Sequence, residues 1–277
     1  MTTTATATVT NDGPSGLAAF PRLLAMEWTK FRSVRSTVFS LLIFIVLTLG
    51  LAALFTWLTV NQWDKIDPDQ RASYQRDAVG NILGGGFFLG QLAICVLGTM
   101  VITTEYSTGM IRASLLAAPK RIPMLAAKAV VFATVTFVVA EIVSFGAFGI
   151  GAPILHSKVE VSLSDPGVLR ALLGAGLYLT MLGLFAMAIG ALVRHTAGAI
   201  TAVIGFVLVL APLAQLLPGS LGKHVHAYLP TEAGHLVAQS VQGPKDLLSP
   251  WQGYGVFCLW TAALLVLAGW LLKRRDA

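Results

Sequence analysis

Long apolar runs separated by short polar segments make up the chain from about residue 38 onward. Six of the runs are long enough to cross the roughly 30 Å of hydrocarbon in a bilayer, which takes about 20 apolar residues in a helix. They lie at 38–60, 82–102, 124–153, 171–193, 197–217 and 252–272. The pattern predicts an all-α integral membrane protein whose six transmembrane helices occupy residues 38–277.

The composition agrees with this prediction. Of the 277 residues, 56% are hydrophobic and 12% are charged, whereas soluble domains carry about 25% charged residues. The first apolar run begins too far along the chain for a cleaved signal peptide, so we expect it to remain as a span. Both cysteines, Cys95 and Cys258, lie inside apolar runs and suggest neither a disulfide framework nor a metal-binding pair.

The N-terminal part of the chain divides into two segments. Residues 1–16 are rich in Thr and Ala and lack an apolar period, which predicts a disordered tail. Residues 17–37 differ, because their apolar side chains recur at intervals of three or four. These are Phe20, Leu24, Trp28, Phe31 and Val34. The spacing predicts an amphipathic helix at the membrane interface that connects to the first span.

Aromatic and basic residues give this predicted helix its interfacial character. They are Trp28, Lys30, Phe31, Arg32 and Arg35. Glu27 and Arg35 fall near the apolar stripe, so the amphipathic pattern is imperfect. The alternative is a basic flank whose only role is to orient the first span.

The distribution of Lys and Arg favours one orientation of the spans. With both termini in the cytoplasm, twelve of the 19 Lys and Arg residues face that side. They are Arg22, Lys30, Arg32, Arg35, Arg112, Lys120, Arg121, Lys128, Arg194, Lys273, Arg274 and Arg275. This bias predicts a multi-pass protein of the cytoplasmic (cell) membrane with both termini inside. The positive charge is spread along the bilayer edge, so we expect the lipid bilayer as a partner and no nucleic acid.

A glycine-rich stretch opens the second span. It contains small residues four positions apart, at Gly80/Gly84 and Gly86/Gly90. Such spacings let two helices approach closely in lipid, so Gly84, Gly86 and Gly90 are a candidate contact with a second copy of the chain. The alternative is a flexible helix start with no specific neighbour.

Two ionisable residues fall inside the third apolar run. Glu141 lies near its middle, where an ionised carboxylate costs about 2.5 to 3.5 kcal/mol. It is therefore either a polar or proton-sensitive point on a cargo path, or a protonated acid that forms a hydrogen bond with a neighbouring helix. We favour the second interpretation. Lys128 lies close to the cytoplasmic end, and we expect its ammonium group to snorkel to the interface.

The longest predicted outer connection precedes the last span, at residues 218–251. Prolines interrupt it, and a short amphipathic helix is expected after Thr231 and Glu232. His224, His226 and His235 lie near Glu232 in the sequence but lack a recognisable zinc-ligand spacing. We expect surface or gate-lining polar residues here and no metal site.

Residues 103–123, TTEYSTGMIRASLLAAPKRIP, form a polar and basic interruption between the second and third spans. A helix-prone stretch at 111–118 is bounded by Gly109 on one side and by Pro119 and Pro123 on the other. One interpretation is a rigid peg on which a soluble partner pushes. The other is an ordinary connecting loop that its basic residues keep inside.

The order of residues in this segment resembles permeases of the type-2 ATP-binding-cassette (ABC) exporter family, which commonly have E-x-x-x-G-T followed by leucines, a proline and a basic residue. The matching positions are Glu105, Gly109, Arg112, Leu115, Leu116, Pro119 and Arg121. Met110 departs from the pattern, because the family often has threonine there. Residues 27–37, EWTKFRSVRST, and the Tyr228-Leu229-Pro230 segment are similar to the element before the family's first span and to its last outer loop.

The resemblance implies both an architecture and a set of partners. The fold would have an interfacial connecting helix, six spans, a cytoplasmic coupling helix within 103–123 and re-entrant outer helices within 218–251. Two such membrane domains would assemble with two ABC ATP-binding subunits. The contact with those subunits would involve Glu105, Tyr106, Gly109, Arg112, Leu115, Leu116, Pro119 and Arg121.

A nucleotide site would make the chain an ATPase in its own right. The nearest sequence to a phosphate-binding loop is residues 219–224, but Leu217 and His224 stand where such a loop needs Gly and Ser or Thr. We therefore expect a permease that is not itself an enzyme and binds no cofactor, with ATP and Mg²⁺ on a partner subunit.

Two other function classes stay open. A membrane-embedded enzyme such as an intramembrane protease would need a catalytic motif; the chain contains no HExxH, and its Gly-Pro-Ser-Gly sequence at 13–16 lies in the predicted tail. A non-transporting membrane scaffold or immunity factor would share the topology and would move no cargo.

Overall fold

The computed structural model of the protein describes residues 16–110, 121–243 and 246–274, and no strand occurs within these ranges. Among the described residues, six helices are long and apolar enough to cross a membrane. They are α2 (Arg35–Asn61), α4 (Ala78–Ser107), α6 (Arg121–Leu155), α7 (Val168–Val193), the continuous segment Thr196–Ala214 and α12 (Pro250–Arg274). The all-α membrane fold with six spans is therefore confirmed.

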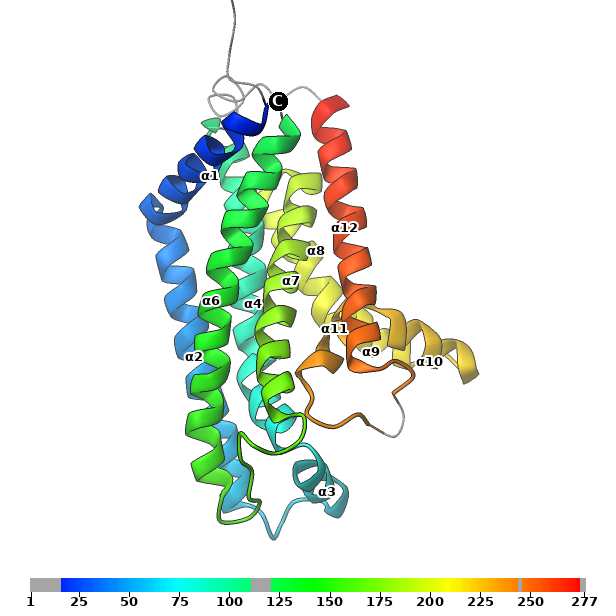
Figure 1. Ribbon diagram of the computed structural model, residues 1–277. Helices are drawn as coiled ribbons and strands as arrows, with labels where there is room; N and C mark the ends of the chain where they lie inside the picture. The colour runs from blue at the N-terminus through cyan, green and yellow to red at the C-terminus, as the bar shows by residue number, and fades with distance from the viewer. Residues whose placement is uncertain (1–15, 111–120, 244–245, 275–277) are drawn as a thin grey trace, which may run out of the picture.

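The span α7 lies at the centre of the bundle (Figure 1). In its most apolar window 67% of the residues are buried by the protein, against 17% for α2 at the periphery. It packs against α4, α6, α8 (Thr196–Gly205) and α12. Small residues make these contacts close: the carbonyl of Gly183 on α7 lies against Gly98 on α4, where a Cβ atom would overlap it.

The ends of α4 and α7 follow from their local sequence. Asp77 caps α4, because its carboxylate accepts a hydrogen bond of 2.9 Å from Gly80 N. Before α7, Gly167 has φ 85°, a left-handed conformation that glycine adopts without steric cost. After α7, Arg194 has φ 59° and ends the helix.

The glycines of α4 give the predicted close approach, but with a different neighbour. A Cβ atom at Gly86 would lie 2.7 Å from the Thr48 carbonyl oxygen of α2, and one at Gly90 would overlap the Thr48 hydroxyl. The expected contact of Gly86 and Gly90 with a second copy is therefore wrong, because α2 of the same chain covers this face. Gly84 has open space around it, and its part in a contact between copies stays a prediction.

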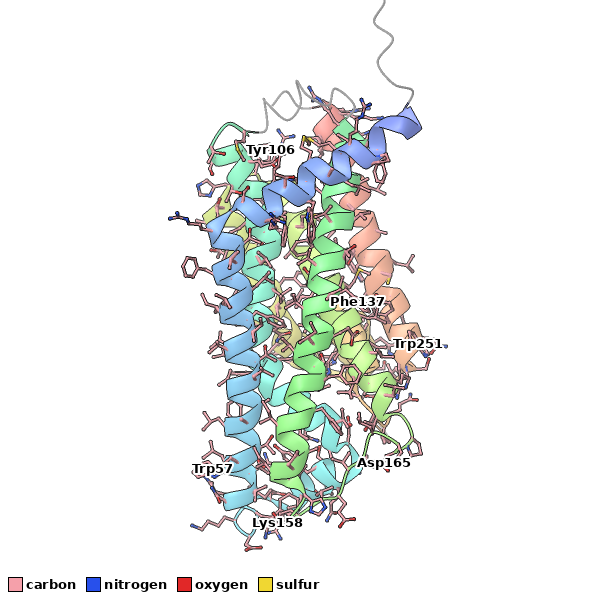
Figure 2. All side chains as sticks on the ribbon, turned by 60° about the vertical axis from the view of Figure 1, so that its left-hand side comes forward. Trp57, Tyr106, Phe137, Lys158, Asp165 and Trp251 are labelled. Atoms are coloured by element: carbon pink, nitrogen blue, oxygen red, sulfur yellow. The ribbon has the colours of Figure 1, made fainter. Side chains whose placement is uncertain are left out.

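The first helix, α1 (Gly16–Ser33), slants across one end of the bundle and packs on α6 (Figures 1 and 2). Val34 is extended, with φ −84° and ψ 111°, and this single residue separates α1 from α2. The predicted helix over 17–37 is therefore too long, and Arg35 is the first residue of α2. Residues 1–15 of the predicted tail lie outside the described ranges.

Short helices lie in the half of the bundle away from α1 (Figure 1). α3 (Pro68–Arg76) precedes α4, α9 (Ala211–Gln215) ends the fifth span, and α10 (Gly219–Tyr228), α11 (Pro230–His235) and η2 (Leu236–Ala238) follow it. That span has a π-helical turn, η1 (Phe206–Leu210), just before Pro212, which has no N–H to donate to the carbonyl four residues earlier.

Within this group, α10 projects sideways while α11 folds back toward the bundle (Figure 1). Ala233, Val237 and Ala238 are buried, and Val237 and Ala238 share the central apolar core with Phe257 of α12. Trp260 Nε1 donates a 3.2 Å hydrogen bond to Tyr228 O, which links α12 to the end of α10.

Candidate functional site

Four charged side chains from three helices meet at the α1 end of the bundle. Lys128 Nζ of α6 lies 2.5 Å from Glu27 Oε2 of α1 and 2.8 Å from Glu105 Oε1 near the end of α4. Lys30 Nζ of α1 lies 3.0 Å from Glu27 Oε1 and 3.0 Å from Glu105 Oε1. We call these four residues the charged quartet. Each ammonium group binds both carboxylates, so the quartet connects α1, α4 and α6 to one another.

The quartet is buried and has no net formal charge. Glu27, Glu105 and Lys128 are each 3% exposed, and the Lys30 side chain is 24% exposed. Burial by itself lowers the pKa of Lys30, but the carboxylates of Glu105 and Glu27 outweigh this effect and raise it above its usual range. Lys30 is therefore cationic at neutral pH.

A buried ion pair adds little net stability compared with apolar packing, whereas removing one partner alone is strongly destabilising. The quartet is consequently better suited to fixing how three helices dock than to stabilising each of them. A displacement of one helix also changes the distances to charges on the other two. Because Coulomb interactions are strong where water is excluded, the three helices are expected to move together.

The sequence of α1 places two members of the quartet on one face. Glu27 and Lys30 are three positions apart, so they are neighbours on the helix surface. Phe31 beside them packs edge to face on Phe132 of α6, with ring centroids 6.4 Å apart. Glu27 disturbs the predicted apolar stripe because it lies on the buried face, where Lys128 neutralises it.

The expected snorkelling of Lys128 is wrong. Its side chain does not extend to the surface, because two carboxylates hold its ammonium group inside the protein. The available signal was that Glu27 and Lys128 break two apolar patterns near the end of the bundle where Glu105 follows the second span. Charges of opposite sign in such positions have to pair when they are buried.

Other contacts connect the segment after α4 to the remaining spans. Figure 2 shows Tyr106 at the same end of the bundle as α1. The Arg194 guanidinium at the end of α7 lies 5.1 Å from the centre of the Tyr106 ring. At the start of α6, Arg121 Nη1 donates a 2.6 Å hydrogen bond to Leu272 O of α12. Gly109 has φ 72°, which is consistent with a local break in the chain.

The structure thus brings Glu105, Tyr106 and Arg121 of the predicted coupling residues into contacts between helices. Arg112, Leu115, Leu116 and Pro119, together with the predicted coupling helix, lie outside the described residues. Of the predicted interfacial residues, Trp28 and Arg32 are exposed, whereas Lys30 turns toward Glu105 of α4 and Phe31 toward Phe132 of α6.

A small cavity of about 40 Å³ lies beside the quartet, between α1, α2, α4 and α6. Ser36, Thr37 and Ser40 of α2 contribute polar groups to its wall. Glu105 Oε2 is buried and accepts no hydrogen bond from the described residues. Both lysines of the quartet therefore bind Glu105 through the same oxygen, Oε1. Residues 106–120 follow Glu105 directly in the sequence.

Glu141 packs against Gly176 of α7 in the middle of the bundle, where a Cβ atom at position 176 would overlap its carboxyl group. Both carboxyl oxygens are buried and make no hydrogen bond with any residue of the described ranges. The hydrogen bond to a neighbouring helix that we favoured from the sequence is therefore not formed with these residues.

A second polar connection lies at the opposite end of the bundle. Asp77 Oδ1 accepts hydrogen bonds from Ser240 N at 3.0 Å and from Ser240 Oγ at 2.5 Å. Arg170 Nη2 of α7 donates a 2.9 Å hydrogen bond to Ser240 O. The segment after η2 is thereby tied to the starts of both α4 and α7.

The histidines of this region occupy different environments. His226 lies 3.3 Å from Glu232, and the ring of His235 packs edge to face on Tyr178, with centroids 5.7 Å apart. Burial lowers the pKa of His235, although nearby carboxylates oppose the shift. In the part of the chain that the structure describes, no three His, Cys, Asp or Glu side chains are grouped as a metal site would require.

Comparison with known proteins agrees with the membrane fold. The family model described as ABC-2 family transporter protein matches residues 23–212. The match covers α1 from residue 23 onward, the spans α2, α4, α6 and α7, and the fifth span up to residue 212. Comparison with curated proteins gives no match.

Proposed function

The chain belongs to the ABC-2 family of transporter proteins, and from this premise we propose that it couples ATP hydrolysis in a separate ATPase subunit to export of a cargo across the cytoplasmic membrane. Family membership makes the chain a permease subunit of an ABC transporter. The ATPase subunit would bind ATP and Mg²⁺. The permease would act with a second copy or with a homologous permease.

The observation that carries this proposal is the charged quartet. Glu105 lies six residues before the undescribed segment 111–120, and Lys128 lies eight residues after it. The quartet therefore joins the two helices that flank the predicted coupling segment, and it adds α1 through Glu27 and Lys30. A force applied between α4 and α6 would reach all three helices.

In the proposed mechanism, the ATPase binds residues 103–123 and changes their position when it binds and hydrolyses ATP. The end of α4 and the start of α6 move, and α1 follows because its two quartet residues bind charges on both helices. The Tyr106 to Arg194 contact extends the movement to α7, and the Arg121 to Leu272 hydrogen bond extends it to α12. The spans would thereby alternate between inward-open and outward-open arrangements.

The orientation follows from the Lys and Arg bias. With both termini in the cytoplasm, α1 and the quartet lie on the side where the ATPase resides. The group α9 to α11 then faces the outside, where it is positioned to respond as the spans rearrange.

The test uses the full chain co-expressed with an ABC ATPase subunit from a neighbouring gene of the same genome, purified as a complex and reconstituted in nanodiscs. A fluorophore on Ser220→Cys in α10, in a Cys258→Ala background, reports at the end of the bundle away from the quartet. We expect ATP to change its emission in the wild type. The neutral variant Glu27→Leu, Lys128→Met removes the ion pairs of α6 and keeps Glu105. In this variant the ATPase should still bind, but the ATP-dependent change should fall at least about tenfold, as for an allosteric coupling of more than 1.4 kcal/mol.

Lys158→Gln is the matched control, because Lys158 is an exposed lysine at the end of the bundle away from α1 (Figure 2). It should leave the ATP-dependent change intact. Failure of the wild-type chain to bind the ATPase would overturn the proposed function. A full response in the neutral variant would overturn the role of the quartet, and a wild-type complex without any response would support a non-transporting scaffold.

A further inference from the structure

An open apolar groove of about 320 Å³ runs between α1 and α6. It is lined by Leu24, Ala25, Trp28, Val130, Val131 and Thr134. Thr134 donates its hydroxyl to Val130 O at 2.9 Å, so this hydroxyl is satisfied within the helix. The other polar group of the lining side chains is the indole N–H of Trp28.

The groove continues along α6 as a narrow apolar row. Val130, Thr134, Val138 and Ile142 occur at every fourth position, and all four are exposed on the surface of the protein. Twelve residues of helix rise about 18 Å, which is close to the roughly 15 Å depth of one hydrocarbon leaflet. The groove and the row together form a long, narrow apolar surface that matches a single extended hydrocarbon chain in length.

Two cations flank the α1 side of the groove. Arg22 is three positions before Ala25, and Arg32 is four positions after Trp28, so each lies on the same side of the helix as a groove residue. Both arginines are exposed. The only acid of α1, Glu27, is buried in the quartet. The exposed face of α1 therefore carries positive charge only.

Trp28 indicates how deep the groove and its two arginines lie in the bilayer. Its side chain is 49% exposed although it lines the groove. Tryptophan is enriched at the level of the lipid headgroups, where one part of the ring is apolar and the N–H is wet. The cations therefore lie at headgroup level, and the row on α6 extends from there into the hydrocarbon.

We propose that this groove binds one acyl chain of an anionic phospholipid from the bilayer, with the headgroup phosphate paired to Arg22 or Arg32. The two parts of such a lipid match the two parts of the site: a chain of leaflet length for the groove and row, and a negative charge for the arginines. A bound lipid contacts α1 and α6 together, so it holds α1 where Glu27 and Lys128 meet. The proposal does not rest on the ATPase partner.

The test is quenching of Trp28 fluorescence by brominated acyl chains, which requires contact between bromine and the ring. The full chain is placed in nanodiscs of phosphatidylglycerol and phosphatidylcholine in equal amounts, with bromine on one lipid or on the other. Subtracting the signal of Trp28→Phe isolates Trp28 from the other five tryptophans. We expect brominated phosphatidylglycerol to occupy the groove at least about fivefold more than brominated phosphatidylcholine, as expected for one arginine beside an anionic lipid.

Two sets of variants separate the headgroup from the chain. Arg22→Gln with Arg32→Gln should abolish the preference, and the control Lys158→Gln should keep it. Ala25→Leu should reduce quenching by both lipids, because it fills the groove. Equal quenching by the two lipids, a preference that survives loss of both arginines, or a Trp28 shielded from both lipids by a second copy of the chain would each overturn the proposal.

Discussion

The ammonium group of Lys128 and the carboxylate of Glu27 lie 2.5 Å apart although 101 positions separate the two residues in the sequence. Both are buried, and each neutralises part of the other's charge within the quartet. The first prediction concerns this pair. Lys128→Met should lower the stability of the protein by about 3 to 5 kcal/mol, because two carboxylates are then left with Lys30 alone.

The double variant Glu27→Leu, Lys128→Met should regain most of that stability, since an apolar pair can replace a buried ion pair at little cost. Thermal denaturation of the chain in nanodiscs measures both variants. Lys158→Met, on the exposed surface, should lie within about 0.5 kcal/mol of the wild type. If the double variant were less stable than Lys128→Met, the two side chains would not act as a pair.

His235 predicts a loss of stability in mild acid. Burial disfavours the imidazolium and lowers the pKa of His235 in the folded protein. The unfolded chain then binds a proton more readily than the folded one, so stability is present above the ordinary histidine pKa and falls as pH drops below it. We expect the denaturation temperature to decrease between about pH 7 and pH 5.

His235→Gln should reduce that dependence, whereas His224→Gln, at an exposed position, should leave it unchanged. The comparison requires the slope of denaturation temperature against pH for the three proteins. Equal slopes for wild type and His235→Gln would contradict the assignment to this histidine.

Gly176 leaves room for the Glu141 carboxyl group. Gly176→Ala should destabilise the protein by about 1 to 3 kcal/mol, as overpacking of a core does, because the new methyl group overlaps the carboxyl. In a Glu141→Ala background the same substitution should have a much smaller effect, and the non-additivity measures the contact. Gly149→Ala, where the new methyl group meets open space, should be neutral or slightly stabilising.

Asp77 should keep the backbone of the segment after η2 in a fixed conformation. Asp77→Ala removes both the cap of α4 and the acceptor for Ser240, with an expected loss of about 1 to 3 kcal/mol. Hydrogen exchange at the Ser240 amide should become faster, while Asp77→Asn, which retains an acceptor oxygen, should lie in between. Asp69→Ala is the control at an exposed position of α3, and unchanged exchange at Ser240 in Asp77→Ala would sink the prediction.

The six spans could be predicted from the sequence because length and hydropathy are local properties. The break between α1 and α2 could not, because one extended residue, Val34, ends a pattern that continues on both sides. The spacing of Gly86 and Gly90 predicted a close helix contact but gave no information on which helix would fill it. The neighbour, α2, depends on how the whole bundle packs.

The same limit applies to the candidate site. Glu105 could be selected by its position in a family-like motif. Glu27 and Lys128 were visible only as irregularities in two separate apolar patterns, and their pairing depends on the angle at which α1 crosses α6. Charges that disturb apolar stripes in several helices near one end of a bundle are a better guide to such a site than any one of them alone.

The separation of Glu27 from Lys128 also sets an order of events during synthesis. At about 5 to 20 residues per second, a ribosome needs roughly 5 to 20 s to proceed from Glu27 to Lys128. Until Lys128 has been made, Lys30 of the same helix is the only lysine of the quartet that can pair with Glu27. α1 can reach its final place only after the third span has been made, so it is translated before α6, the helix on which it docks.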